Sequence, residues 1–383
     1  MNSSLEKGYV PGKHPNLPPP VKTTGIMAWA KQNLFSSPLN IVLTLLSVWF
    51  LWTIIPPFFE WAVFNSIWTA GNRQECWDQM SSPGAGACWA FIENRLSLFT
   101  YGFYPAHLQW RVNLSFIMFV LALIPVLYEK MPYRKYGLIY SSIFPFIAGW
   151  LLVGGFGLEK VDTDQFGGIM LTLILGVTGI SFSLPIGIIL ALGRQSKMPV
   201  LRVLCVLFIE FIRGVPLITL LFVASTMLNY FLPPGTVFDL LLRVLIMVTL
   251  FASAYIAEVI RGGLQAIKKG QHEAGDSLGL TYWQAHRLII LPQALKISIP
   301  GIVNTFIGLY KDTTLVLIIG MLDMLGIGDA SLADAQWAGL ANEIYIFEIY
   351  MILTVHREKT RLKIVYYFLS APLHFLQEKL TLL

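Results

Sequence analysis

Charged side chains are scarce in this chain of 383 residues. Asp, Glu, Lys and Arg make up 13% of it, whereas roughly a quarter of a soluble domain is charged. Apolar residue types reach 55%, and the mean hydropathy is +0.64. So few charges cannot cover the surface of a 43.0 kDa globule, which excludes an ordinary cytosolic enzyme and a disordered chain. The composition indicates a protein whose solvent is lipid.

Clustered metal ligands and catalytic groups are also lacking. The six histidines are scattered over loops and tail without the paired spacing of metal ligands, and His272 and His286 are expected to be solvated. We therefore expect no metal site and no catalytic residues, which argues against an integral-membrane enzyme. The chain has no Gly-x-x-x-x-Gly-Lys-Ser/Thr phosphate loop and is not expected to bind ATP or another cofactor itself. Its net charge of +5 is spread over several short loops, so nucleic acid is not an expected partner.

Long apolar runs are what the chain has instead. About 20 helical residues are needed to cross a hydrocarbon core of about 30 Å. Eight runs reach or approach that length, and some exceed it, so tilt and kinks are expected. The predicted spans are 41–59, 112–128, 137–157, 166–193, 204–232, 237–260, 297–320 and about 338–355. The preceding residues 1–40 are polar and proline-rich, which predicts a flexible arm rather than a signal peptide.

Lysine and arginine are distributed unevenly between the segments that join these spans. Twenty lie in the N-terminal arm, in the tail after 356 and in three alternate loops, whereas the intervening segments hold four. The three basic loops are 129–136, 194–203 and 261–296. By the positive-inside rule, both termini and these loops are predicted to be cytoplasmic.

The predicted outer loop 60–111 contains two of the three cysteines, Cys76 and Cys88. In an oxidising periplasm these two would form a disulfide. The alternative is a pair of free thiols. Cys205 lies inside a predicted span, where packing is its expected role.

The cytoplasmic segment 271–292 has the clearest local signals. Residues 271–278 suit a short helix, with Glu273 and Asp276 expected near its N-terminal end, where the helix dipole favours negative charge. Gly279 then stands where a left-handed residue ends such a helix.

A second helix is predicted to follow this glycine. Thr281 and Gln284 fit a capping box at its start, and Pro292 is expected to limit it. A helix, a turn and a helix outside the bilayer would suit docking onto a cytosolic partner. A merely structural amphipathic turn is the alternative.

This segment resembles the EAA loop of ABC-importer permeases. The matching positions are Glu273, Ala274, Gly275, Gly279, Ile289, Leu291 and Pro292, with Gly275 in place of the usual second alanine. Three further segments, in family order, resemble the polar amino-acid (histidine/glutamine-type) permeases: 211–217 (FIRGVPL), 253–262 (SAYIAEVIRG) and 309–315 (LYKDTTL). The extra N-terminal spans and the cysteine-bearing outer loop are similar to the AapM-type subunit of a general L-amino-acid importer.

The resemblance implies an all-α integral membrane fold, a multi-span bundle with a type I importer (MetI-like) core and about three extra N-terminal spans. The implied organisation is an arm over 1–40, extra spans over 41–157, a core over 165–355 that contains the EAA loop 268–296, and an atypical tail over 356–383.

The implied function is that of an inner-membrane permease subunit of an ATP-driven L-amino-acid importer. The implied partners are a second, different permease, a periplasmic binding protein and a cytosolic ATPase dimer that uses ATP and receives the EAA loop. An ion-coupled secondary carrier is the alternative. It would need no docking loop and would be expected to show internal repeats, and we find none.

Ionisable residues inside spans are costly and indicate function. Two pairs near the cytoplasmic ends of their spans could each neutralise their charges on one helix face: Glu210 with Arg213, and Glu258 with Arg261. They are expected either to form a gate or structural contacts, or to touch substrate directly. Gly214 and Pro216 predict a kink beside the first pair, which would suit a moving gate.

A second charged group lies deeper. Lys311 is about 14 residues into its predicted span, roughly 21 Å at about 1.5 Å per residue, which is past the middle of the membrane. An amino acid is a zwitterion, and Lys311, Asp312, Thr313 and Thr314 supply donors for its carboxylate and acceptors for its ammonium group. Neighbouring side chains on a helix diverge by about 100°, so some are expected to line the pathway and others to brace adjacent helices.

The C-terminal region departs from the family pattern after about Phe347. Glu343 and Glu348 interrupt the last apolar run, and the charged stretch 356–363 ends it. Either the last helix ends early, or a change of reading frame has replaced the original C-terminus.

Overall fold

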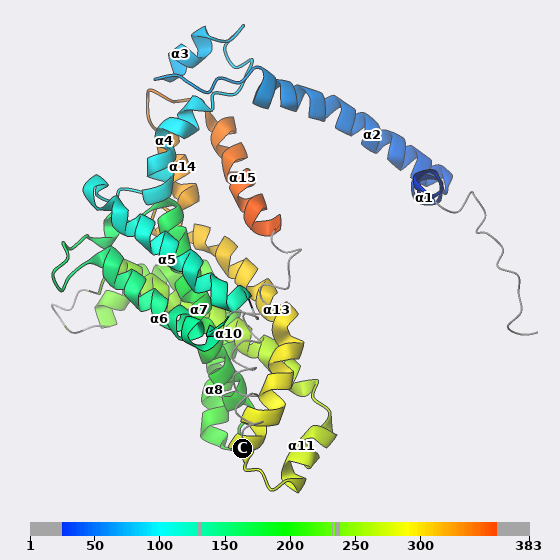
Figure 1. The fold of residues 1–383 in the computed structure, drawn as a ribbon, viewed down its shortest axis with the longest axis vertical. Helices are drawn as coiled ribbons and strands as arrows, with labels where there is room; N and C mark the ends of the chain where they lie inside the picture. The colour runs from blue at the N-terminus through cyan, green and yellow to red at the C-terminus, as the bar shows by residue number, and fades with distance from the viewer. Residues whose placement is uncertain (1–24, 129–131, 232, 234–237, 358–383) are drawn as a thin grey trace, which may run out of the picture. The chain divides into compact units, whose positions relative to one another are not determined.

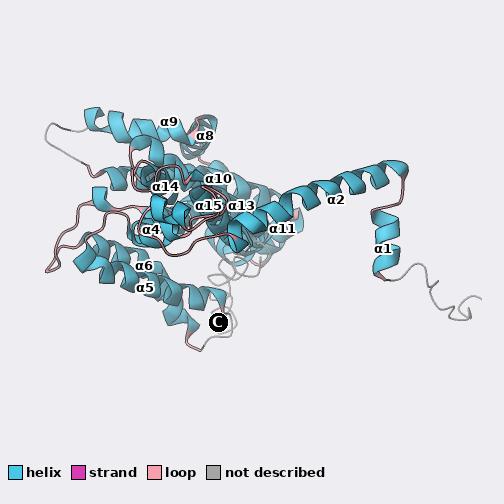
Figure 2. Cartoon of the chain, turned by 90° about the horizontal axis from the view of Figure 1, so that it is seen from above, coloured by secondary structure: helices cyan, strands magenta, loops and turns pink. Residues whose placement is uncertain are grey.

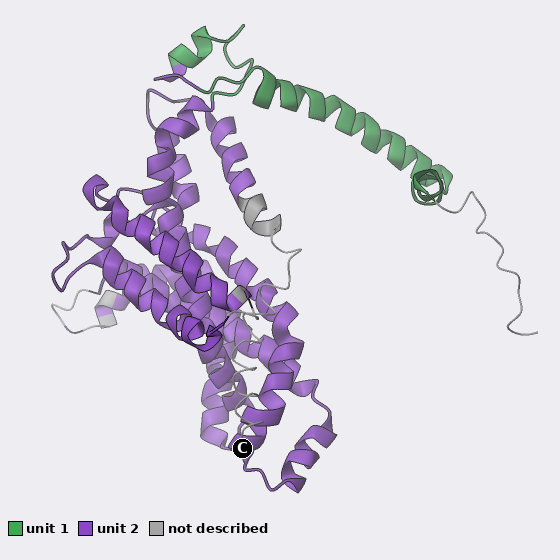
Figure 3. Ribbon diagram, viewed as in Figure 1, with its two compact units in different colours: residues 1–68, 74–88 green, residues 69–73, 89–383 purple. Residues whose placement is uncertain are grey.

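The computed structural model describes residues 25–128, 132–231, 233 and 238–357. The chain forms two compact units, Met1–Trp68 with Gln74–Cys88, and Thr69–Arg73 with Trp89–Leu383 (Figure 3). The described residues are helical and contain isolated bridges but no strand. Most of the predicted arm, and the tail from residue 358, lie outside the described residues.

The first unit is built around one long apolar helix. Its elements are α1(Ile26–Asn33), α2(Pro38–Phe59), η1(Glu60–Phe64) and α3(Arg73–Asp78), the last beginning in the other unit. Ser37 caps α2 by accepting a hydrogen bond from the Asn40 backbone N–H at 3.2 Å, and Pro38 occupies the first turn, where its missing N–H costs nothing. Two internal prolines at 56 and 57 come just before the π-helical turn η1.

In this unit Cys76 and Cys88 form a disulfide, with 6.1 Å between their Cα atoms. Both cysteines are fully buried. Backbone hydrogen bonds from Ile67 to Ala87 and from Ala87 to Trp61, each 2.8 Å, hold the end of the first span against the segment that contains Cys88. The outer loop is therefore an ordered substructure and not a plain connection.

The second unit holds the remaining helices. They are α4(Ala90–Tyr101), η2(Ala106–Leu108), α5(Gln109–Leu127), α6(Arg134–Val153), η3(Thr163–Gln165), α7(Gly168–Arg194), α8(Pro199–Gly214), α9(Leu217–Phe222), η4(Val223–Met227), η5(Leu228–Phe231), α10(Leu240–Gln265), α11(Lys269–Ser277), α12(Tyr282–Ala285), η6(His286–Ile290), α13(Leu291–Asp312), η7(Thr313–Ile319), α14(Met324–Leu332) and α15(Ala341–Arg357).

Helices α7, α10 and α13 form the centre of this unit, with α10 packed against both of the others (Figure 1). Small residues allow the close approach. A Cβ at Gly187 of α7 would come within 2.5 Å of Ile256, and one at Gly263 of α10 within 2.5 Å of the Ala294 carbonyl oxygen. Helices α5 and α6 lie side by side as a hairpin next to this centre (Figures 1 and 2).

Among the described residues, six helices are long and apolar enough to cross a membrane, or up to seven if the bent pair α8 and α9 is one span. They correspond to the first seven predicted spans. The eighth span, about 338–355, stays a prediction: α15 begins at Ala341, after a turn at Gly339 whose φ is +93°, and continues to Arg357, where the described residues end.

The bend between α8 and α9 measures 103° and lies at Val215 and Pro216. Pro216 has no backbone N–H to continue the helix, and the residue before a proline avoids the helical conformation. Val215 is accordingly extended, with φ −108° and ψ 131°. The kink predicted from Gly214 and Pro216 is confirmed.

Helix α4, which lies in the N-terminal part of the second unit, packs against α14 and α15 (Figure 1). Phe91 stacks on Trp337 with ring centroids 5.3 Å apart, and Arg95 forms an ion pair with Asp334. Helix α11 lies at the opposite end of the unit. Helix α4 therefore braces the segment that joins α14 to α15.

Helix α14 is fixed at its start by the buried carboxyl group of Asp323. Its Oδ1 accepts a hydrogen bond from the Gly326 backbone N–H at 3.0 Å, and the N–H of Met324 donates to Thr172 of α7 at 3.3 Å. Burial raises the pKa of Asp323 to about 6.

We expect non-reducing peptide mapping of the purified protein to yield a peptide pair linked through Cys76 and Cys88, with Cys205 unlinked. A bridge of this loop size stabilises by about 3 kcal/mol at most, so a Cys76→Ser, Cys88→Ser double variant should make the outer segment more sensitive to protease. Cys205→Ser is the matched control. Alkylation of both Cys76 and Cys88 in the native protein without reductant would contradict the bridge.

Candidate functional site

The segment between α10 and α13 forms the predicted helix, turn and helix. Helix α11 ends before Gly279, whose φ is +67°, the left-handed conformation that favours glycine. Thr281 and Gln284 form the predicted capping box: the Gln284 N–H donates to Thr281 Oγ1 at 3.4 Å, and the Thr281 N–H donates to Gln284 Oε1 at 2.9 Å.

Two details of the prediction for this segment are wrong. Helix α11 begins at Lys269, so Glu273 lies in its middle and Asp276 in its last turn. Glu273 consequently faces Lys269 one turn earlier, at 3.6 Å, rather than the helix N-terminus. The second helix also continues through Pro292, because the π-helical turn η6 precedes it and Pro292 falls in the first turn of α13, where its missing N–H is not needed.

The segment is folded tightly on itself. Gly275 is buried, and a Cβ there would lie 3.3 Å from the Ala285 Cβ, so glycine at this EAA position lets α11 approach the following helix closely. His286 is buried, 8% exposed, and its ring centroid lies 3.9 Å from that of Tyr282. The expected solvation of His286 is therefore wrong, whereas His272 is exposed as predicted.

The turn between the two helices presents large apolar side chains to its surroundings. Leu278 is 72% exposed and Trp283 is 68% exposed, on either side of Gly279. The carboxylate-bearing side chain of Glu273 is also exposed. Leu278 and Trp283 were not predicted from the sequence, although their place beside the glycine turn was a usable signal.

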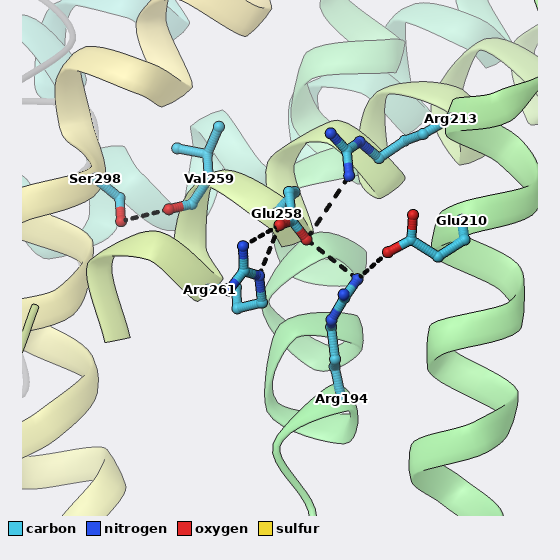
Figure 4. Close-up of polar contacts among 7 residues, drawn as sticks. All are labelled: Arg194, Glu210, Arg213, Glu258, Val259, Arg261 and Ser298. Carbon is cyan, nitrogen blue, oxygen red and sulfur yellow. Dashed lines mark hydrogen bonds and ion pairs between the residues drawn. The ribbon is translucent and has the colours of Figure 1, made fainter. Parts of the chain in front are cut away.

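Five charged side chains from three helices meet near the ends of α7, α8 and α10 (Figure 4). Arg194 of α7 contacts Glu210 of α8 at 2.7 Å and Glu258 of α10 at 3.2 Å. Arg213 lies 3.9 Å from Glu258, and Arg261 donates to it from Nε at 2.6 Å. The Glu258 side chain is only 18% exposed and is shared by three guanidinium groups. We call these five residues the ionic cluster.

The ionic cluster differs from the predicted pairs. Glu258 and Arg261 pair as expected, but Glu210 pairs with Arg194 and not with Arg213. Arg213 instead lies over the ring of Tyr255, 5.6 Å from its centroid. Arg194 was not among the predicted site residues. Its position at the basic, cytoplasmic end of the predicted span 166–193 could have indicated it.

One face of α13 is left uncovered by the chain's own helices. It carries the exposed residues Lys296, Pro300, Asn304 and Lys311, at helical spacing. A Cβ at Gly308, on the same face, would meet nothing within 4 Å. Lys311 has no ion-pair partner among the described residues. We call this face the polar stripe.

The residues next to Lys311 have other surroundings. Thr313 is buried, and its hydroxyl donates to the Tyr310 carbonyl oxygen at 2.8 Å. The Thr314 hydroxyl donates to the Lys311 carbonyl oxygen at 2.9 Å, while Asp312 is half-buried. Lys311 and Thr313 therefore do not face one ligand together.

Arg243 lies inside the predicted span 237–260 and had no predicted role. It is buried on α10, and its Nη1 donates to the carbonyl oxygens of Ala224 and Ser225, at 3.1 and 2.7 Å. These carbonyls belong to the π-helical turn η4 that follows the bent helix pair. Arg243 thus ties the broken helix to α10.

Comparisons with known proteins support the resemblance to amino-acid permeases. A family described as the binding-protein-dependent transport system inner membrane component matches residues 183–355. The inner membrane amino-acid ABC transporter permease protein YhdY of Escherichia coli (strain K12) is 47% identical over 336 residues, covering 87% of this chain and 90% of that one.

A second relative is the glutamate/glutamine/aspartate/asparagine transport system permease protein BztC of Rhodobacter capsulatus. It is 46% identical and covers 86% of this chain and 90% of its own. A crystal structure of an amino acid ABC transporter with histidines has 29% sequence identity and a TM-score of 0.46, over 52% of this chain and 91% of that one.

These relatives support the permease prediction and not the ion-coupled carrier. The similarity to YhdY and BztC extends over most of both sequences and not over one motif. The chain therefore belongs to the inner-membrane permeases of amino-acid ABC transporters, a membrane-spanning subunit of an importer in which a separate ATPase hydrolyses ATP.

Proposed function

We propose that this chain forms one half of the pathway of an L-amino-acid importer and that a different permease forms the other half. A periplasmic binding protein delivers the substrate, and a cytosolic ATPase dimer docks on the helix, turn and helix at 269–285. Both termini face the cytoplasm, and the chain itself binds no ATP. The similarity to permeases whose printed names concern amino acids supports the substrate class.

The observation that carries this proposal is the continuity between the exposed turn and the membrane. Helix α10 leads directly into α11, and η6 leads directly into α13. A movement imposed on Leu278 and Trp283 by a partner is passed on to the two helices that bear Glu258 and the polar stripe. We call the exposed turn that carries Leu278 and Trp283 the coupling surface. The EAA positions Glu273, Ala274 and Gly279 are proposed to maintain its conformation.

The ionic cluster is proposed to act as a gate at the cytoplasmic end of the pathway. Glu258 links α10 to Arg194 of α7 and to Arg213 of α8, next to the bend at Pro216. Separating these helices would leave partly buried charges without partners, which costs several kcal/mol. ATP-driven motion of the coupling surface would supply that free energy once per cycle.

The polar stripe is proposed to line the pathway. A lysine ammonium at this depth is too costly to face hydrocarbon, so Lys311 must face either the pathway or the partner permease. Lys311 and Asn304 offer donors to a substrate carboxylate. Thr313 is proposed to brace the helix and not to contact substrate.

The direct test is uptake of labelled L-amino acids into proteoliposomes that contain this chain with its partner permease, ATPase and binding protein. Uptake that requires ATP on the ATPase side is the expected result. Transport by this chain alone would overturn the proposal in favour of a secondary carrier.

Gly279→Val should lower ATP-dependent uptake by about tenfold or more, because a β-branched residue with positive φ is strained by about 1–3 kcal/mol and the turn would rearrange. Gly279→Asn is the control, since asparagine tolerates the left-handed conformation, and should stay within about threefold of the parent. Normal uptake by Gly279→Val in correctly assembled complexes would contradict the coupling role.

Glu258→Gln should raise ATP hydrolysis in the absence of substrate by roughly three- to tenfold, because the three arginines would lose their shared carboxylate and the closed arrangement would weaken. Glu210→Gln is matched in chemistry, but the Glu210 side chain is 54% exposed and, among the described residues, forms an ion pair with Arg194 alone, so its effect should be smaller. Equal basal hydrolysis in Glu258→Gln and the parent would exclude the gate.

Lys311→Met should reduce uptake at low substrate concentration by roughly tenfold, because methionine keeps the length of the side chain but removes the donor for the substrate carboxylate. Lys296→Met changes the same residue type on the same face 15 residues earlier, nearer the cytoplasmic segment 271–292, and should reduce uptake less than Lys311→Met. Unchanged affinity and rate in Lys311→Met would defeat its assignment to the pathway.

A further inference from the structure

An apolar cavity of about 350 Å³ lies between the α5–α6 hairpin and the core helices α7 and α10. Phe116 and Phe144 form its hairpin side, and Met170 and Leu245 form its core side. None of its lining residues belongs to the coupling surface, the ionic cluster or the polar stripe. The transport mechanism proposed above does not use this cavity.

The length of the cavity is close to the thickness of one membrane leaflet. Its wall on α7 extends from Met170 to Phe182, about 18 Å along the helix at about 1.5 Å per residue. Half of a 30 Å hydrocarbon core is about 15 Å. Because α7 starts at Gly168, on the side of the predicted outer loops, the cavity lies in the leaflet on that side.

Two unpartnered polar groups stand at the same end of α5. Ser115 lines the cavity, is 5% exposed, and its Oγ has no hydrogen-bond partner among the described residues. Arg111 lies one turn earlier on the same helix face, is 3% exposed, and its Nε is likewise unpartnered in the part of the chain that the structure describes. Its Nη1 donates to the Glu159 carbonyl oxygen at 2.7 Å.

We propose that this cavity binds one acyl chain of a phospholipid from that leaflet. The acyl chain lies along the cavity, with the ester oxygens of the lipid near Ser115 and its head group towards the start of α5. An apolar cavity as long as one leaflet is thick, between membrane-spanning helices and with the Ser115 hydroxyl near its outer end, fits the shape and chemistry of a phospholipid chain. A substrate amino acid does not fit, because the lining offers no charged group for either end of a zwitterion.

The lipid would join the hairpin to the core. Helices α5 and α6 pack closely on each other through contacts such as Ser141 Oγ to the Ala122 carbonyl oxygen at 2.6 Å. Along part of the boundary between α6 and α7, the two helices are separated by the cavity and do not pack directly on each other. An acyl chain there would fill the gap with the dense packing that helix contacts normally provide.

Gly149 offers a direct test. It lines the cavity, and a Cβ built on it would meet nothing within 4 Å, so Gly149→Phe can fill the space from within the helix without a backbone clash. Ile139→Phe is the control, because Ile139 is 48% exposed on the same helix and does not line the cavity.

The measurement is native mass spectrometry of the assembled transporter after exhaustive detergent exchange. We expect one retained phospholipid per copy of this chain in the parent and in Ile139→Phe, and occupancy lowered by about tenfold or more in Gly149→Phe, because a close-packed ring leaves no room for the acyl chain. Ser115→Ala should lower occupancy less. Should Gly149→Phe fail to assemble, Gly149→Leu is measured in its place.

Added phospholipid should raise the melting temperature of the delipidated parent and leave that of Gly149→Phe unchanged. Absence of retained lipid in the parent, or equal retention in Gly149→Phe, would overturn the proposal. No lipid in the parent, combined with a lower melting temperature for Gly149→Phe, would indicate instead that protein side chains fill the cavity.

Discussion

Hydrocarbon offers no hydrogen-bond partner, so each backbone N–H and C=O inside the membrane must be paired within the protein. This constraint accounts for the all-helical fold and also for where the helices break. At the 103° bend the α8 helix cannot continue into Pro216. Beyond it, the carbonyl oxygens of Ala224 and Ser225 accept hydrogen bonds from the buried guanidinium group of Arg243. A side chain from α10 thus satisfies carbonyl oxygens of the π-helical turn η4, which follows the bent pair.

The same constraint governs the charged residues. The apolar centre of α7, α10 and α13 packs closely through glycines such as Gly187 and Gly263. Charges are gathered at its end in the ionic cluster, where Glu258 meets three arginines from three helices. Ion pairs of this kind hold the three helices together only while the charged side chains stay within contact distance. A gate requires contacts that form in one arrangement of the helices and break in another. The polar stripe lies apart from it, on the face of α13 that the chain's own helices leave uncovered.

The N-terminal part of the second unit does more than add spans. Helix α4 stacks Phe91 on Trp337 and pairs Arg95 with Asp334, so it supports the segment between α14 and α15 at the end opposite α11. The α5–α6 hairpin encloses the lipid-sized cavity against the core. These contacts join the additional helices to helices that the family match covers.

Sequence by itself determined the membrane class, seven of the spans, the kink at Pro216 and the capped turn at Gly279. Each of these depends on local chemistry: apolar length, the missing proline N–H, the left-handed glycine and a capping pair three residues apart. It could not determine that Glu210 forms its ion pair with Arg194 instead of Arg213, or that His286 is buried against Tyr282. It also could not determine that the helix that begins at Tyr282 continues through Pro292 into α13. Those outcomes depend on which helices lie side by side and on how a π-helical turn shifts the register. Such contacts between residues distant in the chain are set by packing, and only the tertiary structure decided them.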